Sequence, residues 1–484
     1  YETQYFSKQN GWAEQHPDFY FEAICRVSKE ICKKNEEKLR DVIAVTLTVI
    51  RDSVLCLDKN NRALRDIILW LDERQAKNDE PFGLLKKGIF KLVKMEETVK
   101  NQARNSVCNW IMENEPELWK KTEKYVMLPT YLNYKLTGRL CDSAANMVGH
   151  VPFDYKNRRW MTKNDLTRCV CNVPPEKLCE LVPSGTTIGT IGKDVSELTG
   201  IPEGLPLIAT GSDKGCETLG LSVLKDNQAA VSFGTTATVQ MMVRDYFEPQ
   251  KFLPSYPAVP NDMYNPEFQV YRGYWMVSWF VKEFAAEDKK EAEEKGWSVE
   301  RVLDSHLNDV PAGCDGLVLQ PYWTPGIANP LAKGAIIGFS DVHTRRHVYR
   351  AIVEGVDLAL YDGIKMMEKR SGKKISEIFV GGGGSKSPVV CQILANVTGV
   401  PVRCIQTHEA CGLGSSMVAF VAKGEFKSYE EATENMVQVK KTFEPDMDEH
   451  KLYSKIYKNV YSRMYPKLEP IYKRLRKVYR QSAK

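Results

Sequence analysis

The sequence predicts an α/β protein with two large domains. Its length of 484 residues is enough for more than one domain of about 150 residues. Apolar residues recur at helical spacing in some segments and form short β-branched runs in others. Three of these runs open directly onto glycine-containing turns. The pattern breaks at 245–249, so we predict domains of residues 1–244 and 245–484.

Composition narrows the class of protein. Hydrophobic residues make up 43% and charged residues 27%, which excludes a disordered, collagen-like or disulfide-stapled chain. The formal net charge of +5 is small for this length and gives no reason to expect a nucleic acid partner. No run of 18 apolar residues is present, so we expect no membrane partner. Thirteen scattered cysteines without zinc spacing predict reduced thiols and a cytoplasmic location.

The first half alternates between helical and strand patterns. Residues 19–34 have apolar residues at helical spacing, with Asp18 placed as an N-cap. The β-branched run at 42–50 predicts a buried strand, and 53–58 predicts a second one. Residues 84–140 are mostly helical in pattern, and a Thr-Gly pair closes the last of these helices.

Three strands are predicted to end in unusual turns. Residues 207–210 run into Gly211-Ser212-Asp213, and residues 228–233 run into Gly234-Thr235-Thr236. Residues 375–380 run into four glycines and then a helix. Glycine lets backbone N–H groups approach a ligand closely, and a helix N-terminus favours phosphate. The turns match neither the Walker A nor the dinucleotide pattern. One alone reads as a plain turn, but three together favour nucleotide phosphate binding.

Several polar residues near these turns suit chemistry. Asp213, just past a strand end, suits a general base for an alcohol, or else a cap for the helix that follows. Thr235 and Thr236 offer hydroxyls and amides that suit β- and γ-phosphate oxygens. Histidine is rare and lacks zinc spacing, which argues against a zinc hydrolase. The absence of Gly-x-Ser-x-Gly argues against an α/β-hydrolase.

Two charged segments suit a sugar. Arg51-Asp52 interrupts two apolar strands, where buried charges are costly unless they are paired or bound to a ligand. Together they suit polyol hydroxyls, or else form a structural ion pair. Trp70 and Asp72 combine an aromatic face with a charge, which suits a sugar, although the start of a helix explains them nearly as well.

Taken in order, six segments resemble the FGGY family of carbohydrate kinases, within the actin/hexokinase/Hsp70-like superfamily. The resemblance covers nearly the whole chain, and the order of the segments makes it specific. The segments are Tyr134 to Gly138 with Asp142 and Asn146, Gly211 to Asp213, Ser232 to Thr236, Pro321-Tyr322 with Lys333-Gly334 and Gly338, Gly382 to Ser387, and Glu409 to Gly414.

The resemblance implies two actin-like (ribonuclease H-like) domains around a central cleft, the first holding sugar and the second ATP. Asp213 matches the family's catalytic Asp, which deprotonates the sugar hydroxyl. Four residues match the substrate segments: Arg51, Asp52, Trp70 and Asp72. Four match the ATP phosphate site: Gly234, Thr235, Thr236 and Gly334. Four match the adenosine loop: Gly382, Gly383, Gly384 and Ser387.

The implied activity is transfer of the γ-phosphate of ATP to a hydroxyl of a small ketose or polyol. Mg²⁺ is expected to arrive with ATP, with Asp213 as a candidate contact. The Arg51-Asp52 pair is more similar to the Arg-Glu pair of glycerol kinases than to the Met-His pair of xylulokinases. The implied partner is a small-molecule sugar or polyol, and a homodimer stays open because the family commonly forms dimers.

One departure bears on activity. The family opens with a strand hairpin carrying Asp-x-Gly-Thr, which holds Mg²⁺ and ATP phosphates, and residues 1–15 match the segment that normally follows it. The N-terminal hairpin of the first domain is therefore missing from this sequence. Two interpretations stay open. Either the sequence is a fragment, or the protein has lost its first phosphate loop and is a catalytically impaired sugar- or nucleotide-binding protein.

Overall fold

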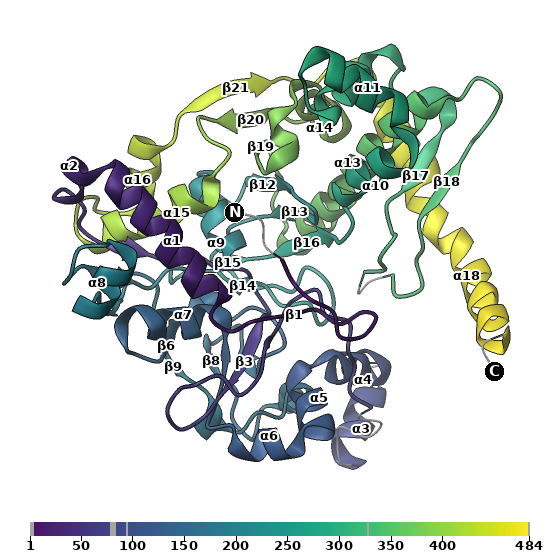
Figure 1. Cartoon of the computed structure of the whole chain (residues 1–484). Helices are drawn as coiled ribbons and strands as arrows, with labels where there is room; N and C mark the ends of the chain where they lie inside the picture. The colour runs from purple at the N-terminus through teal and green to yellow at the C-terminus, as the bar shows by residue number, and fades with distance from the viewer. Residues whose placement is uncertain (1–3, 78–83, 93–94, 327–328, 483–484) are drawn as a thin grey trace. The chain divides into compact units, whose positions relative to one another are not determined.

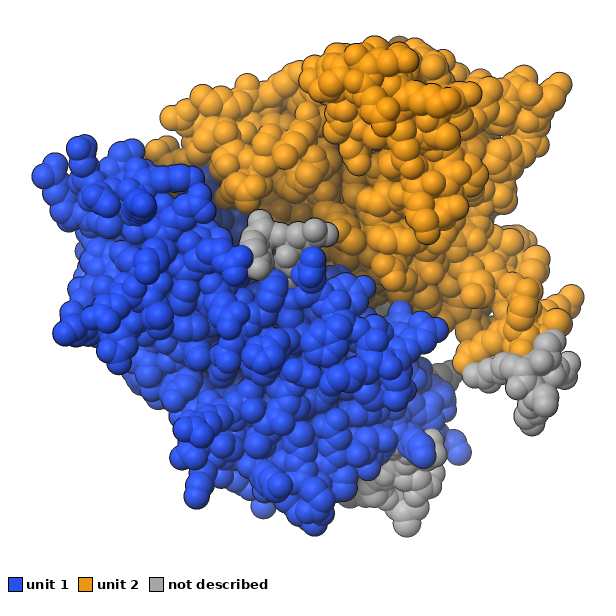
Figure 2. All heavy atoms as spheres, viewed as in Figure 1, with its two compact units in different colours: residues 1–216, 256–263, 411–432 blue, residues 217–255, 264–410, 433–484 orange. Residues whose placement is uncertain are grey.

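The computed structural model describes residues 4–77, 84–92, 95–326 and 329–482 (Figure 1). It confirms a mixed helix and sheet protein and divides the chain into two compact units (Figure 2). Unit 1 comprises residues 1–216, 256–263 and 411–432, and unit 2 comprises residues 217–255, 264–410 and 433–484. The domain boundary at 244/245 stays a prediction; it falls within the first segment of unit 2.

Unit 1 is built from short strands and mostly short helices. Its strands are β1 (Glu14–Gln15), β2 (Val45–Thr46), β3 (Val54–Leu57), β4 (Ile67–Ile68), β5 (Lys124–Met127), β6 (Cys141–Ser143), β7 (Phe153–Asp154), β8 (Arg159–Trp160), β9 (Glu180–Val182), β10 (Thr187–Thr190), β11 (Pro206–Ile208) and β14 (Tyr256–Pro257). Its helices are α1 (Phe19–Lys34), α2 (Glu36–Leu39), α3 (Leu84–Leu92), α4 (Glu96–Asn105), α5 (Val107–Asn114), α6 (Pro116–Lys121), α7 (Leu128–Thr137) and α8 (Lys193–Thr199). Three further helices, α9 (Asp213–Gly220), α15 (Ala410–Ala422) and α16 (Tyr429–Met436), contain the points where the chain passes between units.

Two sheets organise unit 1. One has the strand order β1-β4-β3-β5 and is antiparallel throughout. The other has the order β10-β11-β2, and in it β11 runs parallel to β2, with Leu207 opposite Val45. The strand predicted at 53–58 is β3, whose four residues are all buried.

Two local predictions in unit 1 need correction. The run at 42–50 was predicted as a buried strand, but only Val45–Thr46 is a strand, and 43–50 is half-buried. The reason is that β2 lies at the edge of its sheet in the described part of the chain, so one side of the run lacks a hydrogen-bonded neighbour. Asp18 does precede α1, but its carboxylate makes no cap bond. It accepts instead from Tyr131 Oη at 2.9 Å and Lys135 Nζ at 3.0 Å.

Unit 2 is built around one six-stranded sheet with the order β16-β13-β12-β19-β20-β21. Its strands are β12 (Gln228–Phe233), β13 (Ala237–Gln240), β15 (Tyr264–Asn265), β16 (Glu267–Val270), β17 (Val318–Gln320), β18 (Ala335–Ile337), β19 (Glu377–Gly381), β20 (Val402–Ile405) and β21 (Val439–Phe443). Its helices are α10 (Trp275–Phe284), α11 (Ala286–Lys295), α12 (Val299–Ser305), α13 (Arg345–Ser371), α14 (Pro388–Thr398), α17 (Met447–Ile456) and α18 (Ser462–Ser482). The central strands β12, β19 and β20 are parallel.

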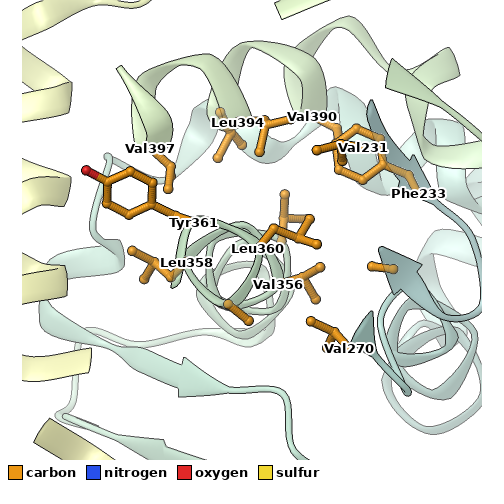
Figure 3. Packing of buried hydrophobic residues seen from close by; sticks show 14 of the residues in the cluster. Val231, Phe233, Val270, Val356, Leu358, Leu360, Tyr361, Val390, Leu394 and Val397 are labelled. Atoms are coloured by element: carbon orange, nitrogen blue, oxygen red, sulfur yellow. The ribbon is translucent and has the colours of Figure 1, made fainter. Parts of the chain in front are cut away.

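The core of unit 2 surrounds α13. This helix contributes residues such as Val356 and Leu360 to one large cluster of buried apolar side chains. Figure 3 shows these side chains between α14, which supplies Val390 and Leu394, and the sheet. Burying apolar surface on several sides of one helix fixes α14, and so the glycine-rich turn that precedes it, against the sheet. None of the described helices is both long and apolar enough to cross a membrane.

One acidic residue, Asp357, lies within this apolar core and lowers its stability. Its side chain is 0% exposed, and neither carboxylate oxygen has a hydrogen-bond partner among the described residues. Burial, together with the charge of Glu354, raises the pKa of Asp357 well above its usual range. A buried carboxyl without partners destabilises the fold whenever the unfolded chain can ionise it freely.

We predict that Asp357→Asn makes stability less dependent on pH. The unfolded chain releases the Asp357 proton near pH 3.9, whereas the folded chain keeps it to higher pH. The free energy of unfolding therefore falls in the wild type as pH rises between these two pKa values. Asn does not titrate, so the variant should become more stable than the wild type by about 1–3 kcal/mol near neutral pH.

Urea unfolding between pH 4 and pH 8 measures this difference. Asp448→Asn on α17 is the control, because Asp448 is exposed and its substitution should leave the slope nearly unchanged. Parallel pH profiles for the wild type and Asp357→Asn would contradict the account of Asp357.

Candidate active site

In unit 1, parallel pairing brings two predicted site segments together. The segments that follow β2 and β11 continue side by side. The Asp213 N–H donates to Val49 O at 3.2 Å, and Thr48 Oγ1 donates to Gly211 O at 3.1 Å. This alignment places Arg51 Nε 3.5 Å from Asp213 Oδ1. The predicted base and the first predicted sugar residue are therefore neighbours, although 162 positions separate them in the sequence.

Asp213 lies at the start of α9, and its roles as base and as helix cap both stay predictions. It is the first residue of α9, and its Oδ1 accepts the Lys214 N–H at 2.8 Å. Its side chain is nevertheless partly exposed beside Arg51. The Cys411 thiol donates to its carbonyl oxygen at 3.2 Å, which adds a second anchor for the backbone. A carboxylate with a fixed backbone and an accessible side chain is suited to accept a proton from an alcohol.

Asp52 is paired with a residue that the sequence analysis missed. Its Oδ1 accepts the His150 N–H at 2.8 Å, and its Oδ2 lies 2.8 Å from His150 Nδ1. Asp52 holds a left-handed backbone with φ 52°. A Cβ at Gly149 would lie 2.4 Å from Asp52 Oδ1, so only glycine fits there. Nothing in the sequence marks His150, because a single histidine 98 positions away from Asp52 forms no motif.

Asp52 and His150 each shift the pKa of the other. Burial by itself would raise the pKa of Asp52, but the charge of His150 and the hydrogen bonds from it hold that pKa below its usual value. Burial by itself would lower the pKa of His150, but the charge and hydrogen bond of Asp52 raise it. Both shifts favour the charged forms, so each residue stabilises the other as an ion pair.

Trp70 and Asp72 lie in different surroundings. The Trp70 side chain is exposed. The backbone N–H of Trp70 donates to Ser53 Oγ at 3.3 Å, next to the Arg51-Asp52 segment. The Asp72 side chain is 1% exposed. Its oxygens accept from Arg74 Nε at 2.7 Å and from the Ala13 N–H at 2.6 Å. Trp70 is thus open to a ligand, whereas the carboxylate of Asp72 is already used by the protein.

In unit 2, the two glycine-containing turns, which follow β12 and β19, lie at the same sheet edge. β12 and β19 are parallel neighbours (Figure 1), and Ser232 is paired with Gly381, so both chains leave the sheet together. Gly382 has φ 78°, and a Cβ there would lie 2.9 Å from Phe233 O. A Cβ at Gly384 would lie 2.8 Å from Phe233 Cβ. Side chains at these positions would push the two turns apart.

The turn after β12 is suited to bind an anion. The backbone N–H groups of Gly234, Thr235 and Thr236 donate to no acceptor in the described part of the chain. The carbonyls of Gly234 and Thr235 accept from Tyr274 N at 3.1 Å and Trp275 N at 3.3 Å, where α10 begins. The carbonyls are therefore directed toward a helix N-terminus, which leaves the amides for a ligand such as phosphate.

Ser387 and Gly334 have clear structural roles. Ser387 caps α14 by accepting the Val390 N–H at 3.4 Å, and its hydroxyl also interacts with Asp304. A Cβ at Gly334 would lie 2.1 Å from Cε3 of Trp323, so the indole ring requires glycine there. Their contacts with adenosine and phosphate stay predictions.

The structure also bears on the expected metal. Within the residues described, no group of three or more His, Cys, Asp or Glu side chains is arranged to hold a metal ion. Mg²⁺ is usually bound by one or two carboxylates together with substrate phosphates. The partly exposed Asp213 fits that mode, in which the cation arrives with a nucleotide.

Solved structures with this fold are sugar kinases. A xylulose kinase from Lactobacillus acidophilus superposes with a TM-score of 0.82 at 21% identity, covering 98% of this chain and 93% of that one. A gluconate kinase from the same organism gives 0.80 at 21% identity, covering 98% and 93%. A Plasmodium falciparum glycerol kinase with ADP gives 0.73 at 16%, covering 95% and 92%. These matches establish the fold as that of sugar kinases.

Sequence comparison identifies the family. The N-terminal domain of the FGGY family of carbohydrate kinases matches residues 1–220, and the C-terminal domain matches residues 229–423. YgcE of Escherichia coli (strain K12), an uncharacterized sugar kinase, is 30% identical over 324 residues, which are 67% of this chain and 66% of that protein. A xylulose kinase of Staphylococcus epidermidis is 26% identical over 468 residues, covering 93% and 88%.

The chain belongs to the FGGY family of carbohydrate kinases. It is a phosphotransferase with an alcohol group as acceptor, and ATP is the phosphate donor of its class. The resemblance found in the sequence is confirmed.

We predict that Asp72 stabilises the fold and does not contact the sugar. Replacing it with Ala removes one of the two carboxylates paired with the buried Arg74, the other being Glu14, and leaves the Ala13 N–H without its acceptor, which should cost about 1–3 kcal/mol. Urea unfolding measures the loss, and the KM for sugar of the folded fraction should change little. Glu180→Ala, which breaks an exposed ion pair with Arg139 in the same unit, should cost less than about 1 kcal/mol. Normal stability with a raised KM for sugar would instead make Asp72 a substrate contact.

Proposed function

We propose that the protein is an ATP-dependent kinase for a small sugar or polyol, with Asp213 as the general base. The observation that supports this most is the placement of Arg51 Nε 3.5 Å from the partly exposed carboxylate of Asp213. A base beside a hydrogen-bond donor suits an acceptor hydroxyl, which the donor can hold while the base takes its proton.

The proposed mechanism divides the work between named groups. Asp213 accepts the proton of the acceptor hydroxyl as the hydroxyl oxygen forms a bond to the γ-phosphorus of ATP. The bond from that phosphorus to the bridging oxygen breaks, and ADP leaves. Arg51 donates to the sugar and holds the carboxylate in place. The amides of Gly234, Thr235 and Thr236 bind phosphate oxygens, and Mg²⁺ supplies positive charge to those oxygens when bound. Phosphoryl transfer depends mainly on such positioning and electrostatics, so few residues need to react chemically.

Charge balance favours an uncharged acceptor. In unit 1, the positive charges of Arg51 and His150 are matched by the negative charges of Asp213 and Asp52. The carboxylate of an acidic sugar would add a negative charge without a positive partner among these four residues. A ketose or polyol would add no charge. We therefore favour an uncharged sugar, even though some family members are named gluconokinases. A cytoplasmic location and a homodimer stay predictions.

We predict that Asp213→Asn reduces turnover by at least about 100-fold, because the amide cannot take the proton of the acceptor. ATP binding measured without Mg²⁺ should change little, because the proposed phosphate and adenosine groups lie on other segments. The assay is sugar-dependent ADP release with ATP and Mg²⁺ over a panel of polyols, pentuloses, hexuloses and aldonates. Near-wild-type turnover of Asp213→Asn would remove Asp213 from the role of base.

The control is Asp194→Asn. Asp194 is an acidic residue in the first turn of α8 in the same unit, and its substitution should leave turnover unchanged. If the wild type binds sugar or nucleotide but releases no ADP with any acceptor, the protein is a binding member of the family without kinase activity.

A further inference from the structure

The carboxylate of Asp52 is already used by the protein. One oxygen accepts the backbone N–H of His150, and the other is paired with His150 Nδ1, both at 2.8 Å. The left-handed backbone of Asp52 and the glycine requirement at Gly149 hold this arrangement in place. Both carboxylate oxygens of Asp52 therefore already have a partner in the protein. The group of this pair that can still contact a ligand is the imidazole ring of His150.

The far nitrogen of that ring is available to a ligand. Among the described residues, none is paired with His150 Nε2, and the side chain is 28% exposed. A carboxylate can only accept hydrogen bonds, so Nδ1 carries the proton that lies between the ring and Asp52. Nε2 then donates a hydrogen bond when the ring is protonated and accepts one when it is neutral.

A continuous set of contacts within unit 1 connects His150 to the proposed base. The Tyr155 hydroxyl donates to Gly149 O at 2.9 Å, and the Tyr155 ring packs against Tyr256 with centroids 5.6 Å apart. The Arg51 guanidinium lies over the Tyr256 ring at 5.7 Å. Arg51 in turn contacts Asp213. The His150 segment thus belongs to the same packed group as the proposed catalytic carboxylate.

We propose that His150 is a sugar-binding residue, whose Nε2–H donates to an oxygen of the acceptor sugar, and that Asp52 is a positioning residue that orients the ring. This inference rests on the proposed function. It reassigns the direct contact from Asp52 to its partner. It also names a donor that complements Arg51, since both groups donate to sugar oxygens while Asp213 accepts.

Burial and three charged or titratable groups act on the charge of the ring. Asp52 favours the protonated form, and burial opposes it. Cys171, whose thiol donates to His150 O at 3.3 Å, adds to the effect of Asp52. The positive charge of Arg51 lowers the pKa of Asp52 and so acts on the ring only through Asp52. The net effect keeps the ring protonated to higher pH than an ordinary histidine.

The decisive experiment compares His150→Ala and His150→Gln in the sugar-dependent ADP assay. We expect His150→Ala to raise the KM for sugar about 10- to 100-fold, as for loss of a charged hydrogen bond, with kcat and the KM for ATP within about threefold. His150→Gln should restore part of the affinity, because its amide also donates. Thermal unfolding of each variant establishes that it is folded.

The pH profile separates a sugar contact from a structural role. In the wild type, kcat/KM for sugar should fall as pH rises through the raised pKa of His150, because Nε2 then stops donating. In His150→Gln that fall should disappear, since the amide does not titrate. Gly149→Ala, which pushes a methyl group into Asp52 Oδ1, should reproduce the KM increase without removing the histidine.

The matched control is His306→Gln. His306 Nδ1 is paired with Asp309 Oδ2 at the same 2.8 Å, and its side chain is 22% exposed, but it lies in unit 2. If His150→Ala leaves the KM for sugar at the level of this control, or raises the KM values for sugar and ATP in parallel, the inference is wrong while the kinase stands. If the wild type phosphorylates no acceptor, the proposed function fails and the inference fails with it.

Discussion

Parallel pairing of neighbouring strands is the constraint on which the candidate site residues of each unit depend. Parallel strands end at the same edge of a sheet, so residues that follow them meet there however far apart they are in sequence. In unit 1 the pairing of β2 with β11 brings Arg51 to Asp213. In unit 2 the pairing of β12 with β19 brings the two glycine-containing turns together. A slip in either register would separate the two segments that the pairing brings together.

The charged groups of unit 1 show how the protein tolerates charges in such places. A buried or half-buried charge is stable when a partner and hydrogen bonds replace water. Asp52 has His150, and Asp72 has Arg74 and a backbone amide. Asp357, in the core of unit 2, has no such partner among the described residues, and its pKa rises well above the usual range as a result. The contrast between Asp52 and Asp357 shows that a charged partner can offset burial and hold the pKa of a buried carboxyl low.

The sequence predicted those features that depend on local pattern. The helix at Phe19–Lys34 and the strand at Gln228–Phe233 have the bounds that periodicity indicates, and the order of motifs identified the family. Features that depend on distant partners were missed. The burial of 42–50 depends on which strands lie beside it, and the role of Asp18 depends on α7. The Asp52–His150 pair joins residues 98 positions apart, so no local spacing could reveal it.

The same reasoning explains why a family motif does not fix substrate specificity. A motif assigns Asp52 to the sugar site because of its position between two strands. Which side chain is available to a ligand, however, depends on the contacts that tertiary packing has already formed. Here Gly149 allows the His150 segment to approach closely enough to take both oxygens of Asp52. A larger residue at 149 would exclude that approach and leave the carboxylate for another partner. In the proposed site, a glycine far away in the sequence therefore decides whether the side chain offered to the sugar is acidic or basic.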